Sequence, residues 1–334
     1  MKIIVPMAGR GSRLRPHTLT IPKPLIPIVG KPIVQRLVED IVKVCDQKVD
    51  EIAFITGDFG SETEAQLKQI AENLGAKGSV YQQEEPLGTA HAILCAAPSI
   101  SGNCVVAFAD TLFRADFTLD TTVDGVIWTK KVEDPSAFGV VKKDTEGYIT
   151  DFIEKPDTFV SDEAIIGIYY FNDGDFLRNE LQYLIDNDIK EKGEYQITNA
   201  LENMKAKGCK FTSGTVNEWM DCGNKNVTVE TNGKVLGFVQ HDEELVHPEA
   251  TIENSQIIAP CYIAKGAVIK NSTVGPLVSV GSDSVVENST INNSIIQNES
   301  QVLNANLTNS MIGNKASFNG QFKSVSIGDY STLD

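Results

Sequence analysis

Long apolar segments are missing from this sequence. The amino terminus, MKIIVPMAGR, has no extended apolar run before its first glycine. No later stretch approaches the roughly 18 to 20 apolar residues that a bilayer-spanning helix requires. We therefore predict a protein with no membrane-spanning segment.

Closely spaced cysteine pairs are also missing. The six cysteines are scattered along the chain, and no CxxC occurs. This spacing favours reduced thiols in the cytoplasm over a disulfide framework or a zinc site, so we predict a cytoplasmic protein. The cysteines are Cys45, Cys95, Cys104, Cys209, Cys222 and Cys261.

Basic residues are in the minority. The chain has 29 Lys and Arg against 45 Asp and Glu, which gives a formal net charge of −16. Such a charge argues against nucleic acid or an anionic membrane as the main partner. An anionic substrate would have to be attracted by a local cluster of Lys and Arg.

The first part of the chain alternates strand and helix patterns, and the length of 334 residues favours two domains. KIIVPM, DEIAFITG, SVYQQ, NCVVAFAD, DGVIWTK and FGVVKK have strand character, whereas PIVQRLVEDIVKVC, SETEAQLKQIAENLG and GTAHAILCAAP have helical spacing. This order predicts an α/β domain with a Rossmann-like, mainly parallel sheet over residues 1–225. Ligands of such sheets bind beyond the carboxyl ends of the strands.

After about residue 245 the helical patterns disappear, and small aliphatic residues recur every five to six positions among Asn, Ser, Thr and Gly. This period predicts a left-handed parallel β-helix of hexapeptide repeats over residues 246–334, after a linker at 226–245. An Asn-rich disordered tail is the alternative, but it would not repeat the aliphatic spacing. The expected inward residues are Ile252, Ile258, Ile263, Val268, Val274, Val280, Val285, Ile291, Ile296, Val302, Leu307 and Ile312.

The first strand leads into AGRGSRLRP, residues 8–16. Its glycines allow the backbone N–H groups to approach a polyphosphate, and Arg13 adds a charge that can neutralise a reacting phosphate. Lys23 follows between two prolines that stiffen its loop. The segment is neither GxGxxG nor a Walker loop, and a glycine-rich turn after a strand can also be only a turn. Together with Lys23, however, it indicates a triphosphate-binding loop.

These two segments resemble a known family. GxGxRLxPxT followed by PKPLxPxxxKPxI is the signature of the sugar-1-phosphate nucleotidylyltransferases, and it stands here at Gly9 to Thr18 and Pro22 to Ile33. The resemblance covers residues 1 to about 225 and is strongest to the glucose-1-phosphate thymidylyltransferases. It implies that a sugar phosphate attacks the α-phosphorus of a nucleoside triphosphate in line and releases pyrophosphate. Lys23 and Arg13 then have catalytic roles, because such a step depends on positioning and charge stabilisation.

The resemblance also implies a magnesium site. VVAFAD ends in Asp110, where the family has a Gly-Asp motif, and WMDCG places Asp221 in the family's W-x-D-x-G. Mg²⁺ commonly takes one or two carboxylates and completes its coordination with phosphate oxygens, so two Asp suffice. A helix cap or a turn is the alternative role for either residue.

The sugar phosphate is assigned to DFIEKP, which resembles the family's E-K-P element. By this resemblance Glu154 accepts hydrogen bonds from sugar hydroxyls, Lys155 binds the phosphate, and Gly139 allows the sugar to lie against the backbone. Without the motif, Glu154 and Lys155 would be interpreted as a solvated charge pair. No catalytic role is assigned to Asn199, which stands where the family commonly has Asp.

The nucleotide is assigned to Ala8, Gly9, Gly11 and Ser12 and to the segment QQEEPLGTA, residues 82–90. In that segment the resemblance points to Gln83, Gly88 and Thr89. A carboxamide offers a donor and an acceptor, which suits the N3–H and O4 of thymine or uracil, so dTTP or UTP is favoured. Guanine would favour a carboxylate, and Glu84 is adjacent.

The β-helix of related enzymes can be an acetyltransferase, a regulatory element or an assembly surface. Residues 250–334 contain no histidine, whereas acetyl transfer usually relies on a His base. We therefore predict a homo-oligomer in which this domain serves assembly or regulation. The alternatives are a mannose-1-phosphate guanylyltransferase, a bifunctional N-acetylglucosamine-1-phosphate uridylyltransferase and acetyltransferase, and a non-catalytic regulator that binds nucleotide sugars.

Overall fold

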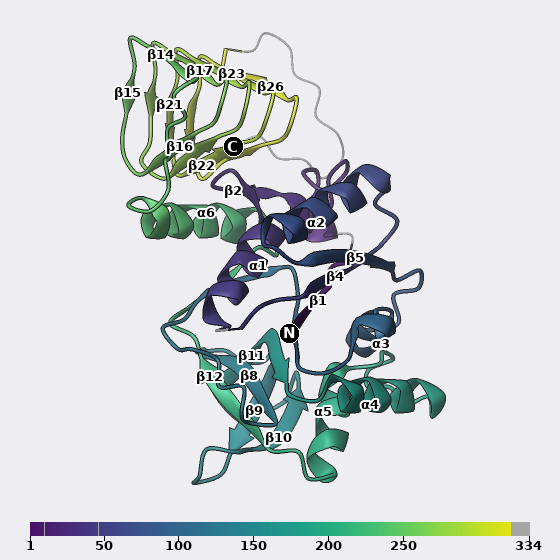
Figure 1. The fold of residues 1–334 in the computed structure, drawn as a ribbon. Helices are drawn as coiled ribbons and strands as arrows, with labels where there is room; N and C mark the ends of the chain where they lie inside the picture. Colours follow the sequence, from purple (N-terminus) through teal and green to yellow (C-terminus); the bar gives the residue numbers. More distant parts are fainter. Residues whose placement is uncertain (10, 46, 322–334) are drawn as a thin grey trace. The chain divides into compact units, whose positions relative to one another are not determined.

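The computed structural model describes residues 1–9, 11–45 and 47–321, and the chain forms two compact units (Figure 1). The first unit consists of Met1–Ser12, Ile21–Leu25 and Pro32–Asp221. The second consists of Arg13–Thr20, Ile26–Lys31 and the chain from Cys222 onward. Two short N-terminal segments therefore belong with the C-terminal part, which a division at residue 225 does not anticipate.

The elements up to Asp221 follow the alternation seen in the sequence. In chain order they are β1 (Lys2–Pro6), η1 (Ser12–Leu14), η2 (Lys23–Leu25), β2 (Pro27–Ile28), β3 (Lys31–Pro32), α1 (Ile33–Val44), β4 (Glu51–Thr56), α2 (Ser61–Asn73), β5 (Lys77–Gln82), α3 (Thr89–Leu94), η3 (Ala97–Ser99), β6 (Cys104–Ala107), β7 (Thr111–Arg114), β8 (Gly125–Lys131), β9 (Gly139–Lys143), β10 (Ile149–Glu154), β11 (Glu163–Phe171), α4 (Gly174–Asp186), α5 (Ile197–Ala206), β12 (Phe211–Thr215) and β13 (Glu218–Asp221).

Nine strands of the first unit form one sheet. Its main path runs β10-β9-β11-β6-β1-β4-β5, and β8 joins β11 to β12. Strands β6, β1, β4 and β5 are parallel neighbours, whereas β11 pairs antiparallel with β6, β8 and β9. The predicted α/β class is confirmed, with an antiparallel half built around β11.

Every residue of β4 is buried, as expected for a strand in a sheet whose two faces are both covered by helices. On one face Ile4, Ala53 and Val106 pack in a single core with residues of α3, α4 and α5. On the other face the alternate residues, such as Ile3 and Phe54, are fully buried. The core therefore holds the carboxyl ends of the parallel strands in fixed positions.

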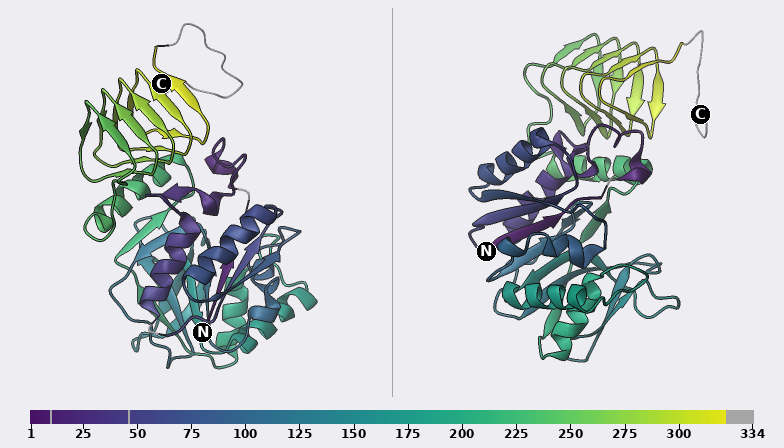
Figure 2. Two further views of the ribbon diagram at one scale, coloured as in Figure 1. Left: turned by 45° about the horizontal axis from the view of Figure 1, so that its top comes forward. Right: turned by 90° about the vertical axis from the view of Figure 1, so that its right-hand side faces the viewer.

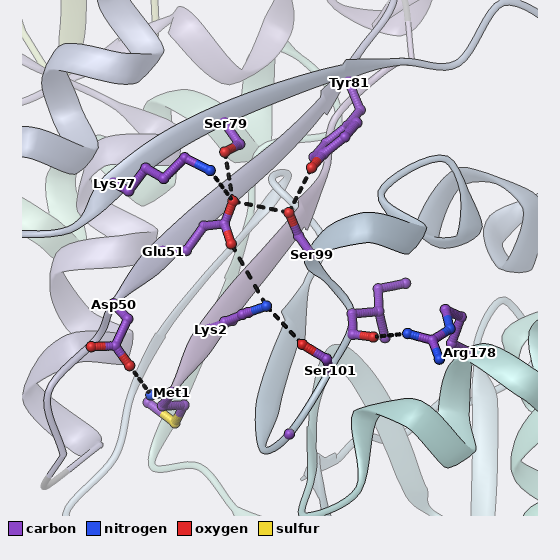
Figure 3. A network of polar contacts seen from close by, with 12 residues as sticks. Met1, Lys2, Asp50, Glu51, Lys77, Ser79, Tyr81, Ser99, Ser101 and Arg178 are labelled. Atoms are coloured by element: carbon purple, nitrogen blue, oxygen red, sulfur yellow. Dashed lines mark hydrogen bonds and ion pairs between the residues drawn. The ribbon is translucent and has the colours of Figure 1, made fainter.

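A polar network joins the amino ends of the parallel strands (Figure 3). The Oε1 atom of Glu51, in β4, accepts hydrogen bonds from Ser79 Oγ at 2.6 Å, Ser99 Oγ at 3.0 Å and Lys77 Nζ at 3.3 Å. Burial by itself raises the pKa of Glu51, but these hydrogen bonds outweigh burial, and the pKa is lowered. Charged groups at this edge are thus paired with one another.

The second unit contains helix α6 and a solenoid of short strands (Figure 2). Three parallel sheets form the sides of the solenoid, in the orders β14-β17-β20-β23-β26, β15-β18-β21-β24 and β16-β19-β22-β25. The elements are α6 (Lys225–Val239), β14 (Thr251–Glu253), β15 (Gln256–Ile257), β16 (Cys261–Ile263), β17 (Val268–Lys270), β18 (Thr273–Val274), β19 (Val278–Val280), β20 (Val285–Glu287), β21 (Thr290–Asn292), β22 (Ser294–Ile296), β23 (Gln301–Leu303), β24 (Asn306–Thr308), β25 (Met311–Ile312) and β26 (Ser317–Asn319).

The register explains the aliphatic period. Thr251 pairs with Val268, 17 positions later, and Val285 pairs with Gln301, 16 positions later. Each coil of 16 or 17 residues is divided among three sides, so equivalent side-chain positions recur every five to six residues. The predicted left-handed β-helix fold is confirmed, as far as residue 321; residues 322–334 lie outside the described part of the chain.

One set of predicted inward residues is shifted by a single position. Ile269 and Val286 are fully buried in the solenoid core, whereas Val268 and Val285 are only partly buried. Neighbouring side chains of a strand point to opposite faces, so in β17 and β20 the central residue takes the inward place. Ile252, also predicted to point inward, is 40% exposed.

Two further sequence expectations concern the helices and the thiols. Residues 226–245, which the sequence suggests as a linker, begin with helix α6. No helix within the described ranges has the length and apolarity that crossing a bilayer would demand. None of the six cysteines, all of which lie in the described part of the chain, forms a disulfide.

Candidate active site

The loops that follow the parallel strands meet at one edge of the sheet. In the sheet, β4 and β5 lie on one side of β1, whereas β6, which follows them in the chain, lies on the other side. The direction in which successive strands are added therefore reverses at β1. The backbone N–H of Ala109, after β6, donates to the carbonyl of Pro6 at 3.3 Å. The loop after β4 also lies close to the loop after β1, because a Cβ atom added to Gly57 would be only 3.2 Å from the carbonyl oxygen of Ala8. The sheet therefore brings together loops whose motifs are far apart in the sequence.

The glycine-rich loop after β1 has the openness that polyphosphate binding requires. Ala8 is half-buried, whereas Gly9 and Ser12 are exposed. A Cβ atom at Gly9 would meet nothing within 4 Å, and Gly11 has a φ of +62°, in the region that glycine adopts readily. The loop leaves its backbone accessible in front of β1.

The segment Arg13–Thr20 belongs to the second unit, outside the unit that carries the other predicted site residues. Arg13 is exposed there. His17 lies against the solenoid, with Nδ1 3.5 Å from the position of a Cβ atom on Gly313. Burial, and then the charge of Lys225, lower the pKa of His17. Residues 250–334 contain no histidine, but the second unit, to which they belong, includes the half-buried His17.

Lys23 and Asp110 form the centre of the candidate site. Lys23 Nζ lies 3.1 Å from Asp110 Oδ2, across 87 positions of sequence. The lysine side chain is 9% exposed and the aspartate side chain 48%. A buried ammonium group is costly unless it is paired, so this contact holds Lys23 in place while Asp110 remains open to solvent.

The second predicted metal ligand lies on the adjacent ribbon. Strand β7 begins directly after Asp110 and pairs antiparallel with β13, which places Asp221 opposite Thr111. Asp221 is exposed. Among the described residues no three or more His, Cys, Asp or Glu side chains gather as a complete metal cluster. Two neighbouring carboxylates nevertheless fit Mg²⁺, which takes its remaining ligands from phosphate and water oxygens.

Glu154 and Gly139 face each other across the β9–β10 pair. A Cβ atom on Gly139 would lie only 3.1 Å from Glu154 Oε2, so a side chain there would crowd the carboxylate. Burial raises the pKa of Glu154, and the nearby ammonium of Lys155, with Nζ at 3.5 Å, counteracts this only in part. The space that a side chain at Gly139 would fill is thus bounded by a carboxylate, and we call this space the recess.

Lys155 leaves strand β10 in an unusual conformation. Its φ is +42°, which is strained for a residue other than glycine. Its N–H donates to the carbonyl of Phe138 at 3.1 Å, and its own carbonyl accepts from Lys192 Nζ at 3.0 Å. These contacts hold an exposed lysine next to the recess.

Sequence reasoning missed two residues beside this recess. Lys192 stabilises the charged form of Glu154 and so opposes part of the rise in its pKa. Thr198, with its methyl carbon 3.7 Å from a Cβ atom on Gly139, has a buried hydroxyl with no hydrogen-bond partner in the described part of the chain. Both belong to or adjoin the GEYQITN segment, whose resemblance to the family motif was the available signal.

The segment predicted to bind the base follows β5 at the same edge. The N–H of Gln83 donates to the carbonyl of Thr56 at 2.8 Å, which continues the β4–β5 ladder. Gly88 has a φ of +118°, and a Cβ atom there would lie 2.5 Å from the carbonyl oxygen of Tyr195. Only glycine fits this position.

The hydroxyl of Thr89 is already engaged within the protein. It donates to Gln196 Oε1 at 3.1 Å and accepts from the N–H of Ile197 at 3.0 Å, at the start of α5. Thr89 therefore ties α3 to α5, and its hydroxyl has no proton left to donate to a nucleotide.

The fold therefore places a glycine-rich loop, a buried lysine and two carboxylates at the carboxyl edge of an α/β sheet. Residues 2–236 match the model of the Nucleotidyl transferase family, and the chain belongs to this family.

Individual relatives extend over most of the chain. The low-salt glycan biosynthesis nucleotidyltransferase Agl11 of Haloferax volcanii is 31% identical, covering 95% of this chain and 93% of the relative. The glucose-1-phosphate thymidylyltransferase of Streptomyces antibioticus is 29% identical, covering 90% and 88%. A crystal structure of UDP-glucose pyrophosphorylase with UDP-glucose is similar with a TM-score of 0.58 and 26% identity, covering 71% of this chain and 98% of that one.

Proposed function

We propose that this protein transfers a nucleotidyl group from dTTP or UTP to a sugar 1-phosphate, with glucose 1-phosphate favoured, and releases pyrophosphate. The observation that carries the proposal is the contact of Lys23 with Asp110, beside Asp221, at the carboxyl edge of the sheet. Membership of the nucleotidyl transferase family supports the reaction type. The similarity to a thymidylyltransferase and to a UDP-glucose pyrophosphorylase supports the substrate class.

The reaction is a single displacement. An oxygen of the sugar phosphate forms a bond to the α-phosphorus, and the bond from that phosphorus to the pyrophosphate oxygen breaks. Lys23 would bind the triphosphate, and Arg13 would stabilise the charge that develops on the leaving pyrophosphate. Asp110 and Asp221 would hold Mg²⁺, which neutralises phosphate charge when bound.

The sugar phosphate would occupy the recess at Gly139. Glu154 would accept hydrogen bonds from sugar hydroxyls, and Lys155 would pair with the phosphate. Ala8, Gly9, Gly11 and Ser12 would offer backbone N–H groups to the triphosphate. Holding both substrates in line supplies much of the rate enhancement of such a step.

The test is pyrophosphate release from each of the common nucleoside triphosphates, paired with glucose, mannose and N-acetylglucosamine 1-phosphates, with magnesium present. We expect turnover with dTTP or UTP. Absence of turnover with every pair would overturn the proposal. GTP used with mannose 1-phosphate would instead identify a guanylyltransferase.

Replacing a predicted metal ligand tests the site itself. Asp110→Asn should lower kcat by at least about 100-fold, because the amide cannot supply the carboxylate charge. This change also leaves the buried Lys23 without its counterion, so circular dichroism must show that the variant is folded.

Asp221→Asn makes the same test at an exposed residue. Asp162→Asn, at an exposed carboxylate that contacts Lys131 at 3.4 Å, is the control. Full activity in both site variants would remove these residues from the proposed metal site.

The β-helix is proposed to serve assembly or regulation, in a homo-oligomer. Acetyl-CoA and glucosamine 1-phosphate should give no acetylated product, and light scattering should report more than one chain per particle. An acetylated product would favour the bifunctional alternative.

A further inference from the structure

Two neighbours fix the orientation of the Gln83 side-chain amide. Its Nε2 atom lies 3.3 Å from the carbonyl oxygen of Gly88 and 3.0 Å from Nδ1 of His91, in α3. A carbonyl oxygen can only accept, so the amide must turn its NH₂ group toward it. His91 Nδ1 must then accept the second N–H, and the ring carries its proton on Nε2.

This arrangement uses both N–H groups of the amide. Gln83 Oε1 has no hydrogen-bond partner among the described residues, and the side chain is half-buried. The backbone N–H of Gly88 likewise donates to no group in the described part of the chain. The segment therefore presents one side-chain acceptor and one backbone donor, rather than a carboxamide that can turn either way.

We propose that His91 is a positioning residue that holds Gln83 Oε1 as a fixed acceptor for the nucleobase and so selects bases with a ring N–H. The inference rests on the proposed function. Uracil and thymine have a donor at N3 and guanine has one at N1, whereas cytosine and adenine have a bare acceptor at the equivalent positions. An acceptor that cannot turn repels the second group of bases. A freely turning amide would accommodate both groups.

The test compares kcat/KM for UTP or dTTP with kcat/KM for CTP and ATP. His91→Phe keeps a ring of similar size but removes the acceptor at Nδ1. We expect the preference for UTP or dTTP over CTP to fall at least about tenfold, because only the 3.3 Å contact with the Gly88 carbonyl then opposes turning of the amide NH₂ toward the base. The change should appear mainly in the KM of the nucleotide, with the KM of the sugar phosphate unaltered.

His91→Asn is the matched control, because the side-chain Oδ1 of Asn is bonded to Cγ as Nδ1 is in histidine and can only accept. We expect it to keep the wild-type selectivity within about threefold. A merely structural role would not distinguish the two variants in base selectivity. If His91→Phe fails to fold, as judged by circular dichroism, His91→Leu makes the same comparison.

The outcomes separate this inference from the proposed function. Turnover in which His91→Phe retains the wild-type selectivity, or in which His91→Asn loses it to the same extent, overturns only the role of His91. A wild-type preference for CTP or ATP overturns the role of His91 and the assignment of dTTP or UTP, but leaves nucleotidyl transfer to a sugar 1-phosphate standing. Absence of turnover with every triphosphate overturns the proposed function and this inference together.

Discussion

Glu154 and Glu51 show how strongly the surroundings of one carboxylate determine its behaviour. Burial raises the pKa of Glu154, and the nearby Lys155 offsets it only partly. At Glu51 burial acts in the same direction, but hydrogen bonds from Ser79, Ser99 and Lys77 reverse the net effect. The carboxylate at the candidate site is therefore poorly compensated in the absence of substrate, whereas the one at the opposite edge of the sheet is well paired.

The two carboxylates should give opposite dependences of stability on pH. A raised pKa in the folded state means that stability is lost as pH rises above the ordinary value of 4.5 and through the raised value. Glu154→Gln should abolish this loss, so the variant gains stability relative to the wild type between pH 4.5 and neutrality. The gain is about 1.4 kcal/mol for each unit by which the pKa is raised. Urea unfolding across this range measures it.

Glu51→Gln is the control of opposite sign. Its lowered pKa contributes stability above the ordinary value of 4.5, which is lost as pH falls through the lowered value. The variant should therefore be less stable than the wild type near neutrality, with a difference that shrinks below pH 4.5. A difference for Glu154→Gln that does not change with pH would contradict the assignment of an uncompensated carboxylate.

At the scale of elements, the corners of the solenoid carry two kinds of polar support. Asn271, Asn288 and Asn304 adopt a positive φ near +50°, a conformation that Asn tolerates better than most residues because its short polar side chain can hydrogen-bond locally. Buried serines join successive coils: Ser289 Oγ accepts from the N–H of Ala305 at 3.0 Å and donates to the carbonyl of Glu287 at 2.8 Å. These contacts satisfy backbone groups that strands alone would leave unpaired.

Ser289→Ala should therefore destabilise the second unit. The side chain is 4% exposed, so its removal leaves the N–H of Ala305 buried without a partner. The expected loss is about 1 to 3 kcal/mol in the free energy of unfolding, measured by thermal or urea denaturation. Ser310→Ala is the control, because the Ser310 hydroxyl bonds Thr308 at an exposed position. Equal losses in both variants would show that burial of the N–H is not the cause.

The elements that the sequence did not reveal have identifiable physical reasons. Strand β11 contains Gly167 at a φ of +83°, and its register shifts between Ile165 and Tyr169, which interrupts the strand pattern. Helix α6 is rich in β-branched residues and glycine, which have weak helix propensity. The start of α6 is marked in the sequence by the N-cap residue Asn224, whose side-chain oxygen accepts hydrogen bonds from the N–H groups of Asn226 and Val227.

At the scale of the molecule, each unit has its own hydrophobic core. We therefore expect unfolding in two transitions rather than one. Both tryptophans, Trp128 and Trp219, belong to the first unit, so their fluorescence reports that unit alone. Circular dichroism reports both. Ser289→Ala should move the transition that fluorescence does not detect; coincident transitions by both probes would contradict two separate cores.

The sequence by itself determined the alternation of strands and helices in the first part of the chain, the solenoid and the residue types of the candidate site. Apolar periodicity and turn residues are local signals, and Gly9, Asp110 and Asp221 are recognisable from motifs of a few residues. Only the tertiary structure decided that Lys23 contacts Asp110 and that Arg13 belongs to the other unit. It also decided that the amide of Gln83 is a fixed acceptor, because burial and hydrogen-bond partners depend on which segments of the chain the fold brings together.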